Sequence, residues 1–392
     1  MHEDRRTIIQ NLVDKKVCIP APATLEIDDR LEIDRISGSG VTIHAATKIL
    51  GTQTFISKNC EIGREGPVTI ENCYLGPGVT LKSGYFKNAV FLEGASLGYG
   101  SHVREGTILE EQANTAHCVG LKQTILFPFV TLGSLINFCD CLMAGGTSRK
   151  SHSEVGSSFI HFNFTPNQDK ATPSLIGDVP RGVMLDQRPI FLGGQGGLVG
   201  PCRINYGTVS AAGTIVRKDQ LKPDHLVLGG AGKGGSIPWK PGSIGYSNRI
   251  IESNLVYIGN LFALREWYRH VRRLFISDRF PEILLQGLCA TLDIGVTERF
   301  QRLHDYCALF KETSRIASGD EFDNKLRESV QDLGDLSLRD RFLSRVSDDR
   351  QSIYIDSIQS LPNETRELGT QWLQSIVDKV VADGAGLKAP RA

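Results

Sequence analysis

The sequence predicts a β-solenoid followed by an α-helical segment. A small apolar residue, once a threonine, returns about every six positions: Ile56, Ile62, Val68, Leu75, Leu81, Leu97, Val103, Leu109, Thr115 and Leu121. A six-residue period fits neither the 3.6-residue period of a helix nor two-residue alternation. Gly, Pro, Asn and short polar residues stand between these positions, as tight corners require. Beyond about Ser247 glycine thins out and the period becomes helical.

Residues 1–24 are predicted to cap the solenoid. A short amphipathic segment at 7–13 is followed by Pro20 and Pro22, which cannot continue a helix. The open end of a solenoid exposes apolar side chains and unpaired backbone groups, so a covering segment is expected there.

The repeats are expected to occupy residues 25–246, and the pattern is recognisable from about Leu25 to Leu228. Two stretches break it, near 142–154 and 179–189, and are predicted to be loop insertions. Loops that leave a regular scaffold are common places for functional sites.

Residues 247–392 are predicted to form an α-helical C-terminal domain. Apolar residues alternate in steps of four and three at Tyr257, Leu261, Leu264, Tyr268, Val271 and Phe275. The other face of this helix carries Arg265, Glu266, Arg269, Arg272 and Arg273. Pro281 can begin the next helix, in which the spacing returns at 300–310, and residues 372–380 indicate a last one. The spacing of four and three also suits a helix shared between subunits, but we expect packing within its own domain, because only about two heptads are sustained.

Composition narrows the functional classes. The 44 Lys and Arg residues balance the 44 Asp and Glu residues, so no overall charge recruits nucleic acid or an anionic membrane. No long apolar span or secretion signal is recognisable, and the nine scattered cysteines read as buried thiols. We therefore expect a cytoplasmic protein with no nucleic-acid or membrane partner.

The repeat resembles that of the hexapeptide-repeat proteins, which form a left-handed parallel β-helix with three hexads in each triangular coil. Residues eighteen positions apart should then lie on the same face, as Val103 and Leu121 would. A chance periodicity in a glycine-rich β-sandwich is the alternative. The expected fold is mainly β, a left-handed β-helix followed by helices.

Within this group, residues 119–219 are similar to the C-terminal acetyltransferase domain of the bifunctional enzyme that makes UDP-N-acetylglucosamine. The most specific stretch runs from Leu198 to Asp219 and contains Ala211, Ala212 and Gly213. The resemblance implies that acetyl-CoA, or another acyl-CoA, lies against the backbone at these three residues. Their small side chains suit a close approach, and equally suit a tight corner of the coil.

The resemblance also implies a sugar-nucleotide site. Asn163 matches an asparagine of the family, Phe164 replaces the tyrosine after it, and Lys170 lies near a lysine that follows. Lys122 aligns with another lysine that binds substrate in the family. Asn163 could instead satisfy backbone groups within its loop.

The family's catalytic histidine falls on Ser134 and its tyrosine on Asn137. An unassisted hydroxyl cannot act as the base that the reaction needs near neutral pH. His161, which alternates with Asn163 along a strand, is the preferred replacement, and His152 in the first insertion is the second choice.

Other signals are weak. The Gly-rich stretch 230–235 does not open a helix, and Cys139-Asp-Cys141 lacks a second ligand pair. A zinc site like that of the γ-class carbonic anhydrases would use His102 and His117, but no third histidine follows closely. We therefore expect no metal.

The sequence thus predicts an acyl-CoA-dependent acyltransferase that acts on a sugar nucleotide, assembled as a homotrimer with sites between subunits. No counterpart of the family's nucleotidyltransferase domain is recognisable in residues 1–50. Two alternatives stay open: a sugar-nucleotide-binding protein without catalysis, and a trimeric interaction scaffold.

Overall fold

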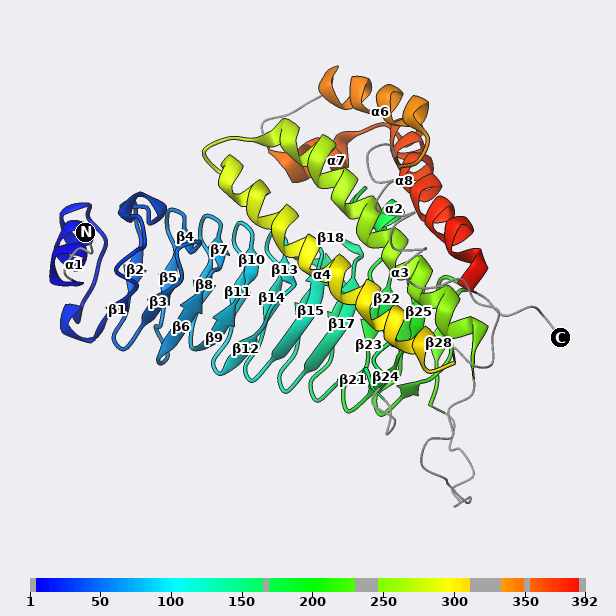
Figure 1. Cartoon of the computed structure of the whole chain (residues 1–392), viewed down its shortest axis with the longest axis horizontal. Helices are drawn as coiled ribbons and strands as arrows, with labels where there is room; N and C mark the ends of the chain where they lie inside the picture. Colours follow the sequence, from blue (N-terminus) through cyan, green and yellow to red (C-terminus); the bar gives the residue numbers. More distant parts are fainter. Residues whose placement is uncertain (1–4, 165–168, 230–245, 311–332, 349–352, 388–392) are drawn as a thin grey trace, which may run out of the picture.

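The strands of the N-terminal part form a parallel β-helix, as predicted (Figure 1). The structure is a computed structural model that describes residues 5–164, 169–229, 246–310, 333–348 and 353–387. The Gly-rich stretch 230–235 and the end of the predicted repeat range therefore lie outside the described residues.

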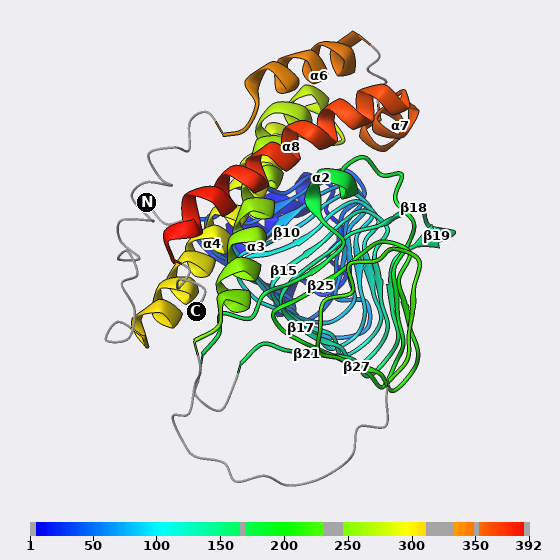
Figure 2. The ribbon, with the colours of Figure 1, turned by 90° about the vertical axis from the view of Figure 1, so that its right-hand side faces the viewer.

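The β-helix has three faces, here called A, B and C, which Figure 2 shows nearly end on. Face A contains β2 (Thr42–Ile43), β5 (Glu61–Ile62), β8 (Thr80–Leu81), β11 (Ser96–Leu97), β14 (Asn114–Thr115), β16 (Thr131–Leu132), β20 (Glu154–Val155), β23 (Phe191–Leu192), β26 (Val209–Ser210) and β28 (Leu226–Val227). Face B contains β1 (Glu26–Ile27), β3 (Lys48–Leu50), β6 (Val68–Glu71), β9 (Gly84–Lys87), β12 (Ser101–Val103), β21 (Ile160–Phe162), β24 (Gly197–Val199) and β27 (Ile215–Val216). Face C contains β4 (Phe55–Ile56), β7 (Tyr74–Leu75), β10 (Ala89–Phe91), β13 (Thr107–Leu109), β22 (Ser174–Ile176) and β25 (Cys202–Ile204). The longer strands β15 (Gly120–Leu126) and β17 (Asn137–Met143) bend around the corner from face B to face C.

The six-residue pattern marks the interior. All ten of its residues are buried, including Thr115. Val103 of β12 pairs directly with Leu121 of β15, which confirms that eighteen residues make one coil here. Parallel strands buried on their inner side account for the repeated Ile, Val and Leu.

Segments leave the coil at both predicted places. In the first, β18 (Gly146–Ser148) and β19 (Ser151–His152) pair as an antiparallel hairpin at the corner between faces C and A. The second contains the short helix α2 (Val179–Gly182). Between β21 on face B and β22 on face C of one coil, the structure describes residues 163–164 and 169–173.

Helix α1 (Arg5–Asp14) covers the N-terminal end of the β-helix (Figure 1), as predicted. Its Ile8 and Leu12 are buried in the same apolar cluster as the first coils. The open end of the solenoid is therefore closed by an amphipathic helix.

The C-terminal helices lie along face C (Figures 1 and 2). They are α3 (Asn248–Glu266), which continues through a π-helical turn (Trp267–Val271) and a 3₁₀ turn (Arg272–Phe275), α4 (Glu282–Ala308), α6 (Leu336–Asp348), α7 (Tyr354–Ser360) and α8 (Asn363–Asp383). Helix α4 packs on β7, β10 and β13. At Gly287 of α4, a Cβ atom would lie 2.6 Å from the ring of Tyr74, so this close approach requires glycine.

The charged face predicted for the first of these helices is mostly not exposed. Arg265, Glu266 and Arg272 are at most 5% exposed, because the β-helix and α4 pack on one side of this segment and α7 and α8 on others. This corrects the expectation of a simple amphipathic helix. Pro281 lies at the N-cap, immediately before Glu282, so it flanks α4 and is not the first residue within the helix.

Most of the cysteines are buried thiols, as predicted, whereas Cys18 and Cys118 are exposed and Cys289 is intermediate. Among the described residues, no helix is long and apolar enough to cross a membrane.

Candidate functional site

Two clusters lie at opposite edges of face B. The first is at the corner between faces B and C, where the backbone of Asp140 turns with φ +61°. The Asp140 carboxylate accepts the amide of Asn163 at 2.8 Å and a guanidinium N–H of Arg299 at 2.7 Å. Asp140 and Arg299 are 4% and 2% exposed. Helix α4 is thus joined to this corner by a buried, hydrogen-bonded ion pair.

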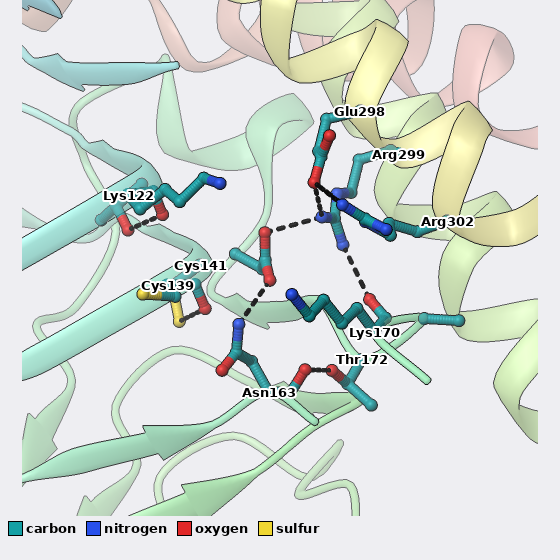
Figure 3. Close-up of polar contacts among 12 residues, drawn as sticks. Lys122, Cys139, Cys141, Asn163, Lys170, Thr172, Glu298, Arg299 and Arg302 are labelled. Atoms are coloured by element: carbon teal, nitrogen blue, oxygen red, sulfur yellow. Dashed lines mark hydrogen bonds and ion pairs between the residues drawn. The ribbon is translucent and has the colours of Figure 1, made fainter. Parts of the chain in front are cut away.

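The predicted substrate residues surround this ion pair (Figure 3). Lys122 on β15 pairs with Glu105 at 2.9 Å and points toward the cluster. The carbonyl of Lys170 accepts a hydrogen bond from Arg299, and its exposed side chain extends toward Asn163. The structure therefore brings Lys122, Asn163 and Lys170 to one corner.

The side-chain NH₂ of Asn163 donates to the Asp140 carboxylate, and the backbone carbonyl of Asn163 accepts from the Thr172 hydroxyl. Phe164, next along the chain, is 60% exposed. The side chain of Asn163 therefore bonds to a carboxylate on β17 and not to the backbone of its own loop, and the two lysines and Phe164 are the groups accessible to a ligand.

His161 lies in the interior of the β-helix. Its Nδ1 is 2.5 Å from the carbonyl of Cys139 and its Nε2 is 2.8 Å from the Ser174 hydroxyl. Because a carbonyl only accepts, Nδ1 carries the proton and Nε2 accepts from Ser174, whose oxygen in turn accepts the backbone N–H of Cys202. Burial lowers the pKa of His161 to about 4. Both ring nitrogens are occupied, which corrects the expectation that His161 faces a ligand as a base.

His152 lies in β19 of the hairpin at the C–A corner, and Figure 2 shows this hairpin on a different side of the β-helix from β21, the strand of His161. Its Nε2 is 3.7 Å from Glu154. The structure does not bring the two predicted histidines to one site.

The second cluster follows the corner between faces A and B. Strands β14, β16, β20, β23 and β26 pair in register on face A, so the residue two positions after each strand stacks along this corner. These stacked residues are His117, Ser134, Ser157, Gly194 and Ala212. We call this row the A–B column.

Within the A–B column, the Ser134 hydroxyl is 2.9 Å from Nδ1 of His117, and the pair is accessible to solvent. The backbone N–H of Ser134 also donates to the Ser157 hydroxyl. A histidine therefore stands one coil below the position of the family's catalytic histidine. The sequence did contain this signal, because His117 follows Thr115 as Ser134 follows Leu132.

The far end of the A–B column consists of small residues. Ala212 and Gly213 are exposed, and a Cβ atom on Gly213 would meet nothing within 4 Å. Gly194 packs so tightly that a Cβ atom would lie 2.7 Å from the carbonyl of Ser157. The predicted cofactor residues thus border open space beside a smooth corner.

Faces A and B also expose large apolar side chains on their outer sides, unlike face C under the helices. On the strands these are Ile160, Phe162, Phe191, Val209, Ile215 and Leu226, and Leu135 and Phe164 are exposed at the adjoining corners. Within the described residues, no group of three His, Cys, Asp or Glu side chains is placed to hold a metal ion.

Comparison with known proteins gives the following relatives. No protein-family model matches the chain. The bifunctional protein GlmU of Thermotoga petrophila is 29% identical over 224 residues, which are 57% of this chain and 44% of the relative. GlmU of Geotalea uraniireducens is 29% identical over 220 residues, 56% of this chain and 42% of the relative. The chain thus spans less than half the length of these curated relatives.

Among solved structures, the polysialic acid O-acetyltransferase OatWY aligns with 55% of this chain and 82% of its own, with 14% identity and a TM-score of 0.19. The chain thus combines a six-residue repeat and a parallel β-helix with sequence similarity to the bifunctional GlmU proteins over 57% of its length.

Proposed function

We propose that this protein is an acyltransferase that moves an acyl group from acyl-CoA to an acceptor carried by a sugar nucleotide. The relation to GlmU supports the reaction class. The observation that carries the proposal is the solvent-accessible His117–Ser134 pair at the A–B corner, because an accessible imidazole oriented by a hydrogen bond can serve as the base of such a reaction.

In this proposal His117 is the general base and Ser134 is a positioning residue. The Ser134 oxygen accepts the Nδ1 proton of His117, which leaves Nε2 to take a proton from the attacking amine or hydroxyl. The attacking atom bonds to the thioester carbonyl carbon, and the C–S bond then breaks. The leaving thiolate recovers the proton from the imidazolium, so that His117 returns to its starting state.

The A–B column supports acyl-CoA as the donor. Ser134 and Ala212 are three coil steps apart, or about 14 Å at the usual spacing of paired strands. Along this distance the A–B column consists of serine, glycine and alanine, with Leu135 and Gln195 exposed beside it. An extended pantetheine chain fits against such a row, with its thioester near His117 and its remainder beside Ala211, Ala212 and Gly213.

Lys122 and Lys170 are proposed to hold the phosphates of the sugar nucleotide, with Phe164 beside them. They lie at the B–C corner, across face B from His117, so one protomer does not bring acceptor and base together. The helices cover face C, whereas faces A and B expose apolar side chains. A homotrimer packed through faces A and B would cover this apolar surface, and in this proposal the acceptor and the base of one site come from different subunits.

One observation favours the second candidate function, a sugar-nucleotide-binding protein without catalysis. Ser134 stands where the related acetyltransferases are expected to carry their histidine, and His161 is enclosed. If His117 does not act as a base, the two lysines could still bind a nucleotide.

The deciding experiment incubates the full chain with acetyl-CoA and a panel of amino sugars and UDP-sugars, with product detected by mass spectrometry. H117A should lower kcat by about 10²–10⁴-fold, the usual contribution of a general base. S134A should lower kcat with KM kept, while H225A, a change at another exposed histidine, should leave both constants unchanged. UDP-sugar binding without turnover in the wild type, or full activity of H117A, would favour the binding protein.

Oligomeric state is tested separately by light scattering at micromolar concentration. A trimer is expected for the wild type, and F162E on face B should yield monomers that keep their circular dichroism spectrum. A monomeric wild type would remove the shared site.

A further inference from the structure

A cavity of about 300 Å³ lies between the β-helix and the C-terminal helices, away from both clusters described above. Its β-helix wall is the C–A corner at Glu93, Gly94, Glu111 and Gln112. Its other wall comes from the 3₁₀ turn after α3, the segment before α4, and the start of α7. This volume is at the lower end of the range for small-molecule sites.

Arg272 forms the polar floor of the cavity and is 1% exposed. Its guanidinium lies between two rings, 3.8 Å from the centroid of Tyr354 and 4.3 Å from that of Phe280. One of its nitrogens donates to Glu111, but Nε and Nη1 have no hydrogen-bond partner among the described residues. Buried polar groups are normally paired, so two unpaired donors beside a cavity require an explanation.

The cavity lining also includes an unpaired hydrogen-bond acceptor. Oε2 of Glu111 is buried and has no hydrogen-bond partner within the described part of the chain. The cavity is therefore lined by two paired residues, of which Arg272 has unpaired donor atoms and Glu111 an unpaired acceptor atom. Arg272 pairs with Glu111 and Arg279 pairs with Glu93, so the charges of the four lining side chains already balance.

The remaining wall is apolar. Phe275, Phe280 and Tyr354 contribute aromatic rings, and Ile353 and Ile355 contribute aliphatic surface. Aromatic and aliphatic walls with a few convergent polar groups are typical of sites that bury most of a small ligand.

We propose that this cavity binds a small neutral compound with adjacent hydroxyl groups, of monosaccharide or cyclitol size. Its hydroxyl oxygens accept from Nε and Nη1 of Arg272, and a hydroxyl proton is donated to Oε2 of Glu111. Its C–H face lies on the aromatic wall. Because the charges of the lining already balance, a neutral ligand fits better than an anion, whose charge would face Glu93 and Glu111.

The test titrates the full chain with D-glucose and myo-inositol by isothermal calorimetry and saturation-transfer NMR, with benzoate as an anionic probe of similar size. R272K keeps the charge but loses the planar donor set, and should weaken binding at least about tenfold, as expected for lost hydrogen bonds to a charged group. R273K changes the neighbouring exposed arginine and should bind like the wild type.

S277W is the second variant, because Ser277 is exposed yet lines the cavity, so a bulky ring there fills the space without removing a buried group. It should abolish binding while the circular dichroism spectrum stays native. The proposal is overturned if neither hydroxylated probe binds at concentrations up to about 50 mM, at which even a weak complex is detected. It is also overturned if benzoate alone binds, or if S277W binds as well as the wild type. None of these results depends on acyl transfer.

Discussion

Substitutions in the ion pair between Asp140 and Arg299 test how much this contact between α4 and the β-helix contributes to the free energy of unfolding. Both side chains are nearly inaccessible, and the Asp140 carboxylate accepts from Arg299 at 2.7 Å and from Asn163 at 2.8 Å. Asp140→Asn keeps the size of the side chain but removes its charge. Its new NH₂ group then faces one of the two donors, so one hydrogen bond is replaced by a donor–donor contact.

We expect D140N to lower the free energy of unfolding by about 3–5 kcal/mol, because Arg299 is left as an uncompensated buried charge. The lost charge-assisted hydrogen bond accounts for about 1.5–3 kcal/mol of this. R299M should cost a similar amount. The double variant D140N/R299M should cost clearly less than the sum of the single ones, because no buried charge remains in it.

The measurement is urea unfolding followed by far-UV circular dichroism, with the slope checked for two-state behaviour. R345M is the control, since Arg345 and Glu364 form an ion pair with side chains 37% and 76% exposed. Such a pair contributes about 0–1 kcal/mol. If D140N costs no more than R345M, or if D140N and R299M are additive, this ion pair does not hold α4 on the β-helix.

Three further outcomes are expected. Burial raises the pKa of Glu110 from 4.5 to about 7, so its contribution to stability is full below pH 4.5 and is lost as pH rises through 7. The free energy of unfolding of E110Q, measured in urea between these pH values, should not show this loss, which in the wild type is at most about 1.4 kcal/mol per pH unit. If E110Q and the wild type have the same pH profile, Glu110 does not cause the loss. The lowered pKa of His161 acts in the opposite direction: stability present above pH 6.5 is lost as pH falls toward 4, and H161Q should be free of this loss in the same assay. Finally, G287L should separate α4 from Tyr74, seen as faster hydrogen exchange in α4 with the N-terminal coils unchanged; equal exchange would contradict the close packing.

The charges around Glu110 explain why its titration is a property of the folded chain. After burial, the negative charge of Glu111 is the main cause that raises its pKa, while Arg272 and the hydroxyl of Tyr268 oppose the rise. Tyr268 lies 158 residues away in the sequence. Periodicity near residue 110 predicts a coil corner there, but does not reveal which groups cover it.

The candidate site was predictable only where its residues follow the coil repeat, and not where residues distant in the sequence meet. Lys122, Asn163 and Lys170 were expected together and do meet at one corner. The residue that organises this corner, Arg299, comes from a helix 159 residues beyond Asp140, and no spacing in the sequence joins the two. His161 alternates with Asn163 as expected, but its interior partner Ser174 belongs to the other side of an insertion.

The sequence by itself determined the six-residue repeat, the buried residues of the coil, the capping helix and the positions of several C-terminal helices. These features are local, because an inward side chain every six residues and a coil every eighteen are distances along the chain. Only the tertiary structure decided that the helices cover face C and that Arg272 is buried beside a cavity. The physical reason is that these contacts depend on how two surfaces dock, which local periodicity does not encode.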